Sequence, residues 1–226
     1  MTALISLWHL SVDASGVMST RGMTMLYWVV IAVAIGLGGT VCAQAQVGQP
    51  RNVQKELAID EQPGYEPSAE EENVPPAYQR QLVFFRTTEP AGTVVVHTSQ
   101  RFLYVVQGNN RALRYGIGVG REGFQWAGLL KISRKAEWPD WIPPSEMIAR
   151  QPYLPRFMAG GPGNPLGARA LYLGSTVYRI HGTNKPQTIG HAVSSGCFRL
   201  VNNAVIDLYD RVPVGTKVVV RHAPEL

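Results

Sequence analysis

A mainly β domain, built as a sandwich or a barrel, is the fold class that the sequence predicts. Of the 226 residues, 45% are hydrophobic and only 16% are charged, and 23 glycines and 16 prolines accompany them. Such a composition is typical of a turn-rich globular domain. From residue 82 onward, short runs of β-branched and aromatic residues recur between turn residues, at spacings typical of all-β folds.

The expected strands begin with a β-meander. Strands are predicted at 93–97, 102–107, 112–118, 127–133, 170–173, 177–180 and 217–221. Between the second and third of these runs, the sequence Gln-Gly-Asn-Asn at 107–110 has the residue types that favour a tight hairpin turn.

Two short helices are expected among the strands. The first covers 144–150, with Ser145 as its capping residue. The second covers 203–212, where apolar residues recur at helical spacing and Asn202 is the expected N-cap.

Residues 1–45 are predicted to be an N-terminal signal segment. An uncharged apolar run, Met25 to Val41, follows Arg21 and precedes Ala43-Gln-Ala45, which fits a secretory signal that is cleaved after Ala45. An uncleaved membrane anchor is the alternative, because the run has nearly the shortest length that spans a bilayer. The start codon stays open, because further methionines lie at 18, 23 and 25. The domain is therefore expected to be exported, and to meet a membrane only if the signal stays uncleaved.

Residues 46–80 are predicted to form a disordered acidic linker, which leaves 81–226 as the functional domain. Gln, Glu and Pro dominate the linker, and its part from Lys55 to Asn73 has seven acidic residues against one lysine. Such a segment has too few large apolar side chains to offset the entropy cost of its ordering.

The rest of the chain is cationic. From Val74 onward, eighteen Lys and Arg residues stand against eight Asp and Glu. This charge raises the local concentration of anionic partners such as an acidic cell-wall polymer, although a solvated surface explains it equally well. No zinc-finger spacing, aromatic RNA-binding motif or basic helix accompanies the charge, so nucleic acid is not an expected partner.

Cys197 is the candidate nucleophile. The other cysteine, Cys42, lies at the end of the signal segment, so Cys197 is expected to have no disulfide partner after export. His181 precedes it by sixteen residues at the end of an expected strand, where it could take the thiol proton. Without further signals, the alternative is a buried cysteine that only fills space.

Other interpretations of these residues have less support. His191 could serve as the base instead of His181, although its neighbours suggest an exposed loop. His181, His191 and Cys197 do not have the spacing of a zinc site, so neither a metal nor another cofactor is expected. The Ser-x-x-Lys and Lys-Thr-Gly motifs of serine acyltransferases of the penicillin-binding kind do not occur in the sequence.

Three motifs together give a more specific indication. They are Asn-Pro-Leu-Gly at 164–167, His-Gly-Thr at 181–183 and Ser-Ser-Gly-Cys-Phe-Arg-Leu at 194–200. With this spacing, the segment from about Gly92 to Arg221 resembles the L,D-transpeptidase catalytic domain of the YkuD type. The resemblance implies a β-sandwich with one or two short helices, and an enzyme of bacterial peptidoglycan that acts in the periplasm or cell envelope.

The resemblance also implies a mechanism. Cys197 would attack the bond between meso-diaminopimelate and the following D-alanine of a tetrapeptide stem, and would form a thioester. His181 would transfer the protons, the carbonyl of Gly182 would orient its imidazole, and the N–H groups of Gly196 and Cys197 would face the oxyanion. Substrate-binding roles fall to Thr183, Ser194, Ser195 and Arg199.

Some of these roles have alternatives. Arg199 could bind a stem-peptide carboxylate or could hold the loop through backbone oxygens, and Ser194 and Ser195 could simply build the turn. Ser195 also stands where the commoner family pattern has a histidine, but His181 is present, so catalysis is expected to persist.

The acyl acceptor is left open by the sequence. A second stem would give a 3,3-crosslink, an outer-envelope protein would become attached to peptidoglycan, and water would make the enzyme a carboxypeptidase. Carbapenem-type inhibitors are expected to acylate the same thiol. A non-catalytic wall-binding module, which would not need the thiol, is the alternative from another functional class.

Overall fold

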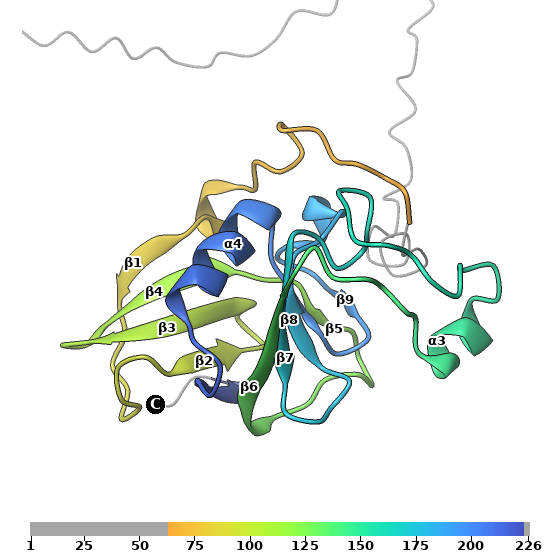
Figure 1. Ribbon diagram of the computed structural model, residues 1–226. Helices are drawn as coiled ribbons and strands as arrows, with labels where there is room; N and C mark the ends of the chain where they lie inside the picture. Colours follow the sequence, from red (N-terminus) through yellow and green to blue (C-terminus); the bar gives the residue numbers. More distant parts are fainter. Residues whose placement is uncertain (1–62, 224–226) are drawn as a thin grey trace, which may run out of the picture. The chain divides into compact units, whose positions relative to one another are not determined.

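The computed structural model describes residues 63–223 (Figure 1). The predicted signal segment, 1–45, and the first part of the predicted linker lie outside these residues. Within 63–223, none of the helices has the length and apolar character needed to cross a membrane.

Strands dominate this part of the chain, which confirms the mainly β fold class with two short helices. The strands are β1 (Gln81–Phe84), β2 (Val94–His97), β3 (Phe102–Gly108), β4 (Arg111–Gly116), β5 (Val119–Gly120), β6 (Gly128–Glu137), β7 (Arg169–Leu173), β8 (Arg179–His181), β9 (Ala192–Ser194), β10 (Phe198–Arg199) and β11 (Lys217–Arg221). The helices are α3 (Ser145–Arg150) and α4 (Asn202–Arg211), and the 3₁₀ turns are η1 (Pro76–Tyr78) and η2 (Pro186–Thr188). Four of these strands, β1, β5, β9 and β10, were not predicted.

The long strand β6 joins the two halves of a nine-stranded sheet, whose order is β1-β4-β3-β2-β11-β6-β7-β8-β10. Its first residues pair with β11 and its later residues pair with β7, with a register irregularity between Ile132 and Arg134. One hydrophobic core receives side chains from both halves, for example Val94 from β2 and Leu171 from β7. The two halves therefore pack face to face as a sandwich.

Helix α4 packs against β7, and Val205 and Leu208 on its apolar face are fully buried. The predicted capping roles are wrong. Val201 is the N-cap of α4, and the side chain of Asn202 instead accepts a hydrogen bond from the backbone N–H of Ala168 at 2.9 Å. Ser145 is the first residue of α3 and makes no capping bond, because Pro144 occupies the N-cap.

Residues 63–80 belong to the segment that was predicted to be a disordered linker, and they lie against the domain. The Asn184 side chain donates to the carbonyl of Tyr65 at 3.2 Å, and Asn202 donates to Glu72 at 2.8 Å. Tyr78 lies so close to Gly116 that a Cβ atom there would come within 2.5 Å of it. The ring of Tyr78 packs against Phe102, with the ring centroids 5.7 Å apart, and supplies contact surface that the acidic composition of the segment conceals.

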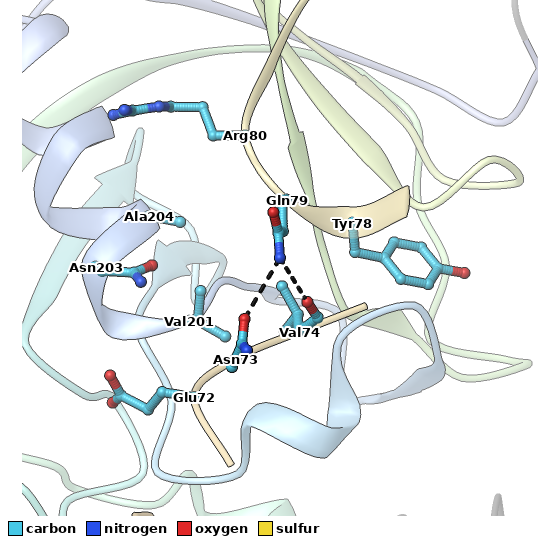
Figure 2. Close-up of a pocket in the computed structure, with 9 residues that line it drawn as sticks. All are labelled: Glu72, Asn73, Val74, Tyr78, Gln79, Arg80, Val201, Asn203 and Ala204. Carbon is cyan, nitrogen blue, oxygen red and sulfur yellow. Dashed lines mark hydrogen bonds between the residues drawn. The ribbon is translucent and has the colours of Figure 1, made fainter. Parts of the chain in front are cut away.

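A pocket lies between this N-terminal segment and the start of α4 (Figure 2). On one side, the Gln79 amide donates to the carbonyl of Val74 at 3.1 Å. On the other side are Val201 and Ala204, and Val201 packs with Val74 in a small apolar cluster. The segment is thereby held against α4 by both apolar and polar contacts.

Candidate active site

Strand alternation brings four polar side chains to one face of the sheet. Ile180 on β8 and Phe198 on β10 are register partners, and both point into the hydrophobic core. Because successive side chains of a strand point to opposite faces, the residues on either side of these two point away from the core. Those residues are Arg179, His181, Cys197 and Arg199.

All four line one cavity. Its apolar walls come from the loop before α3, from α3 itself and from two further loops, with Trp141, Pro144, Met147, Pro165, Leu166 and Val177 as the lining residues. Ser194 and Ser195 complete the polar part. A narrow apolar cavity that contains a few converging polar groups has the character of a ligand site.

His181 is buried, with 4% of its surface exposed, and its tautomer is fixed by its neighbour. Its Nδ1 lies 2.5 Å from the carbonyl oxygen of Gly182, and because a carbonyl only accepts, Nδ1 must donate. The Nε2 atom therefore carries the lone pair that accepts a proton. The Gly182 carbonyl, for which an orienting role was predicted, is thus the group that Nδ1 contacts.

The charge state of His181 follows from its surroundings. The pKa of the imidazole is lowered to about 3, mainly by burial and further by the positive charges of Arg199 and Arg179, while the backbone of Gly182 and of Leu166 opposes the shift. The imidazole is therefore neutral at neutral pH and can accept a proton, and its lowered pKa makes it a weaker base than free imidazole. A resting ion pair between a thiolate and an imidazolium is disfavoured, because burial and both arginines oppose the imidazolium.

Cys197 is partly exposed and forms no disulfide within residues 63–223. Its thiol lies 3.8 Å from the carbonyl oxygen of Val177, to which it donates. The serine at 194 shapes the turn before it, because its hydroxyl donates to the Cys197 carbonyl at 2.6 Å and accepts from the Gly196 N–H at 3.2 Å. The Gly196 N–H, predicted to face the oxyanion, is thus directed to Ser194.

Two aromatic residues that sequence reasoning missed support this turn. The indole of Trp126 donates to the carbonyl of Gly196 at 2.9 Å, and its ring stacks on Tyr178 with the centroids 4.5 Å apart. Gly196 itself has a φ of +105°, and a Cβ atom there would lie 2.7 Å from the ring of Tyr178. No sequence pattern pointed to Trp126, because the contact joins segments that are distant along the chain.

The other predicted site residues fall into two groups. Arg199 is buried with 4% exposure, pairs in register with His181 and lines the cavity. The hydroxyl of Ser195 accepts a hydrogen bond from Arg121 at 3.5 Å. Thr183 and His191 do not line the cavity, and the Thr183 hydroxyl instead accepts from the backbone N–H of Lys185 at 2.9 Å.

Arg179 is a further cavity residue that was not predicted. It lies two residues before His181 on the same strand, so the period of two could have placed it on the same face. Within residues 63–223, no cluster of three His, Cys, Asp or Glu side chains is arranged to hold a metal ion.

A match to a family model gives the class of this mainly β domain, which is that of the L,D-transpeptidases. Residues 91–220 match the family model of the YkuD L,D-transpeptidase catalytic domain. This match covers more than half of the chain, and the chain therefore belongs to that family, as the three sequence motifs indicated.

Among the similar proteins is the probable L,D-transpeptidase YbiS of Escherichia coli K12, which is 37% identical over 147 residues, 61% of this chain and 47% of YbiS. The probable L,D-transpeptidase ErfK/SrfK of the same strain is 37% identical over 152 residues, 64% of this chain and 48% of that protein. The chain thus spans about half the length of the curated relatives it matches.

A solved structure described as a probable carnitine operon oxidoreductase from Brucella melitensis is 48% identical and has a TM-score of 0.44; the alignment covers 68% of this chain and 100% of that one. Its description applies to the Brucella protein, and the family assignment rests on the match over residues 91–220.

Proposed function

We propose that this domain is a peptidoglycan L,D-transpeptidase that works through a thioester on Cys197. The observation that supports this most directly is the cavity that Cys197 shares with His181, a buried and neutral imidazole whose Nδ1–H is held by Gly182. A weakly acidic thiol needs such a base beside it before it can attack an amide.

In the first step, the thiol attacks the carbonyl carbon between the L-centre of meso-diaminopimelate and the D-alanine that follows. His181 Nε2 takes the thiol proton, and the Cys197 N–H faces the developing oxyanion. The carbon–nitrogen bond then breaks, the same proton passes to the leaving amine, and D-alanine departs. The acyl group stays on sulfur as a thioester.

In the second step, an acceptor amine attacks the thioester carbon, His181 takes one of its protons, and the carbon–sulfur bond breaks. That proton returns to the sulfur, so the enzyme regains its thiol. A second stem as acceptor forms a 3,3-crosslink, an amine of an envelope protein attaches that protein to peptidoglycan, and water gives carboxypeptidase action. Carbapenem-type inhibitors would acylate the same sulfur.

The domain is expected to act in the periplasm or cell envelope, where its substrate is found. The cationic balance of the domain suits an acidic polymer. Ser195 occupies the position at which the commoner family pattern has a histidine, and its hydroxyl accepts a hydrogen bond from Arg121. Proton transfer is therefore assigned to His181 alone.

The test is incubation of the domain with disaccharide tetrapeptides, with intact-mass detection of the thioester and mass analysis of the products. Cys197→Ala should form no adduct with tetrapeptide or carbapenem, and His181→Gln should acylate at least 10²-fold more slowly. His191→Gln is the matched control, because His191 lies outside the cavity, and it should keep wild-type rates. A wild-type protein that releases no D-alanine and forms no thioester would overturn the proposal and leave a wall-binding module.

A further inference from the structure

A row of three side chains crosses the sheet next to the nucleophile. Arg134 on β6 is the register partner of Tyr172 on β7, and Tyr172 is the partner of Arg179 on β8. The guanidinium carbon of Arg134 lies 3.6 Å from the centroid of the Tyr172 ring, and that of Arg179 lies 5.2 Å from it. The strand after β8 in the sheet, β10, begins directly after Cys197.

This row forms part of a second pocket that adjoins the catalytic cavity. Trp138, Asp140 and Ile142 also line the second pocket. Arg179 lines both the catalytic cavity and the second pocket, so its side chain lies at the boundary between them. A substrate group that leaves the cavity on this side would pass the guanidinium.

Neither arginine of the row forms an ion pair with an acid of residues 63–223. The Nε atom of Arg179 is buried and has no hydrogen-bond partner among residues 63–223. The two acids of the second pocket have other partners, since Glu137 forms an ion pair with Arg169 at 3.2 Å and Asp140 accepts from the Gly160 N–H at 3.0 Å. An arginine with an unused buried donor, set in a pocket, is suited to a carboxylate ligand.

The proposed reaction brings a carboxylate next to the scissile bond twice. In the leaving D-alanine, the carboxylate is attached to the carbon next to the scissile nitrogen. An acceptor nitrogen must bond to the same carbonyl carbon that the leaving nitrogen departs from, so the two nitrogens occupy one position in turn. When the acceptor is the D-centre of a second diaminopimelate, its nitrogen also has a carboxylate on the adjacent carbon.

We propose that Arg179 binds this carboxylate, first on the leaving D-alanine and then on the acceptor, and so selects amines that have a carboxylate on the adjacent carbon. This inference rests on the proposed function and deepens it. It makes a second stem peptide or a free D-amino acid the preferred acceptor, in place of a lysine side chain, whose amine has no carboxylate nearby. Tyr172 is then a positioning residue that holds the guanidinium over the sheet.

The experiment compares two acceptors, D-alanine and D-alaninamide, which differ only in the carboxylate. The enzyme is first acylated with a tetrapeptide stem, and the two acceptors then compete at equal concentrations of free amine. The ratio of the two aminolysis products is measured by mass spectrometry. We expect the wild type to favour D-alanine by on the order of 10- to 100-fold, as for the loss of a charge-assisted hydrogen bond.

Substitutions of Arg179 test whether this residue causes the preference for D-alanine. Arg179→Gln should bring the ratio close to one, and Arg179→Lys should restore part of it because the charge remains. Arg111→Gln, at an exposed position on β4 in the other half of the sheet, is the matched control and should keep the wild-type ratio. The ratio compares two acceptors on the same protein, so a general loss of activity or of folded protein cancels.

The outcomes separate the two proposals. If the wild type forms no thioester, the proposed function itself fails. If the thioester forms but the two acceptors react equally, or if Arg179→Gln keeps the preference for D-alanine, Arg179 is not the carboxylate receptor and only the present inference fails. A thioester that reacts faster with the ε-amine of a lysine peptide than with D-alanine would also overturn it.

Discussion

The indole of Trp126 donates a hydrogen bond to the carbonyl oxygen of Gly196 at 2.9 Å, across 70 positions of the chain. Gly196 immediately precedes the nucleophile, so this bond fixes the backbone from which the Cys197 thiol projects. The ring of Trp126 stacks on Tyr178, which precedes the cavity strand β8, and the interplanar angle is 14°. The turn of the nucleophile and the strand of the base are thus held together by one aromatic pair.

Trp126→Phe should weaken catalysis more than it weakens the fold. Phenylalanine keeps a ring against Tyr178 but cannot donate to the Gly196 carbonyl, and a hydrogen bond of this kind contributes about 0.5–1.5 kcal/mol. We expect kcat/KM for thioester formation to fall by about 2- to 12-fold, with a small change in the midpoint of thermal unfolding. Stopped-flow acylation with a carbapenem measures the first quantity, and an unchanged acylation rate would show that the bond has no role in the site.

Gly196→Ala should damage the turn itself. The φ of +105° strains any residue with a side chain, and the added Cβ atom would lie 2.7 Å from the ring of Tyr178. Strained backbone costs on the order of 1–3 kcal/mol, and displacement of Cys197 should lower the acylation rate at least 100-fold.

Gly215→Ala is the matched control for this substitution. Gly215 also has a positive φ, +92°, but a Cβ atom there has nothing within 4 Å. It should show the backbone strain in unfolding experiments without the loss of acylation. Equal loss of activity in both variants would mean that the contact with Tyr178 is not the cause.

The sequence predicted the parts of the fold whose signals are local. The runs that became β2 and β3 consist largely of β-branched and aromatic residues, and both strands lie within a residue or two of the predicted limits. Strands β5 and β10 have two residues each, too few to show any periodicity, and they exist because neighbouring segments pair with them. Tertiary contacts decided these elements.

The residues of the candidate site also divide into those that local motifs predict and those that only long-range contacts reveal. Cys197 and His181 could be found from motifs and spacing, and Arg179 could have been found from its position two residues before His181. Asn202 was assigned a local capping role, but its side chain bonds to Ala168, which is 34 positions away in the chain. Trp126 was missed for the same reason, because nothing in a single sequence pairs residues at such distances.

Tyr115→Phe tests a buried connection between β4 and α4. The fully buried Tyr115 donates to the Asp207 carboxylate at 2.6 Å, and Arg211 donates to both oxygens of that carboxylate at 2.8 Å. The bonds from Arg211, followed by that from Tyr115, hold the pKa of Asp207 well below its usual range. Removing the tyrosine hydroxyl should lower the free energy of unfolding by about 1.5–3 kcal/mol, the range for a hydrogen bond to a charged group.

Urea unfolding of the two proteins measures this difference. Tyr209→Phe is the matched control, because Tyr209 lies on helix α4 together with Asp207. The centroid of the Tyr209 ring is 3.9 Å from the Lys135 ammonium, a contact that phenylalanine preserves. Its stability should stay within about 0.5 kcal/mol of the wild type. A similar loss in both variants would attribute the effect to the helix rather than to the bond with Asp207.

Acid pH should destabilise the folded protein through His181. Burial lowers the pKa of this imidazole from 6.5 to about 3, so between these pH values the unfolded chain binds a proton that the folded protein does not. The stabilisation is therefore complete above pH 6.5 and is lost as pH falls, at about 1.4 kcal/mol per pH unit. From pH 7 to pH 5, the wild type should lose about 2 kcal/mol more than His181→Gln, in urea unfolding at each pH. His191→Gln, which leaves the buried imidazole in place, should follow the wild type, whereas parallel pH curves for the wild type and His181→Gln would show that His181 is not held neutral by its burial.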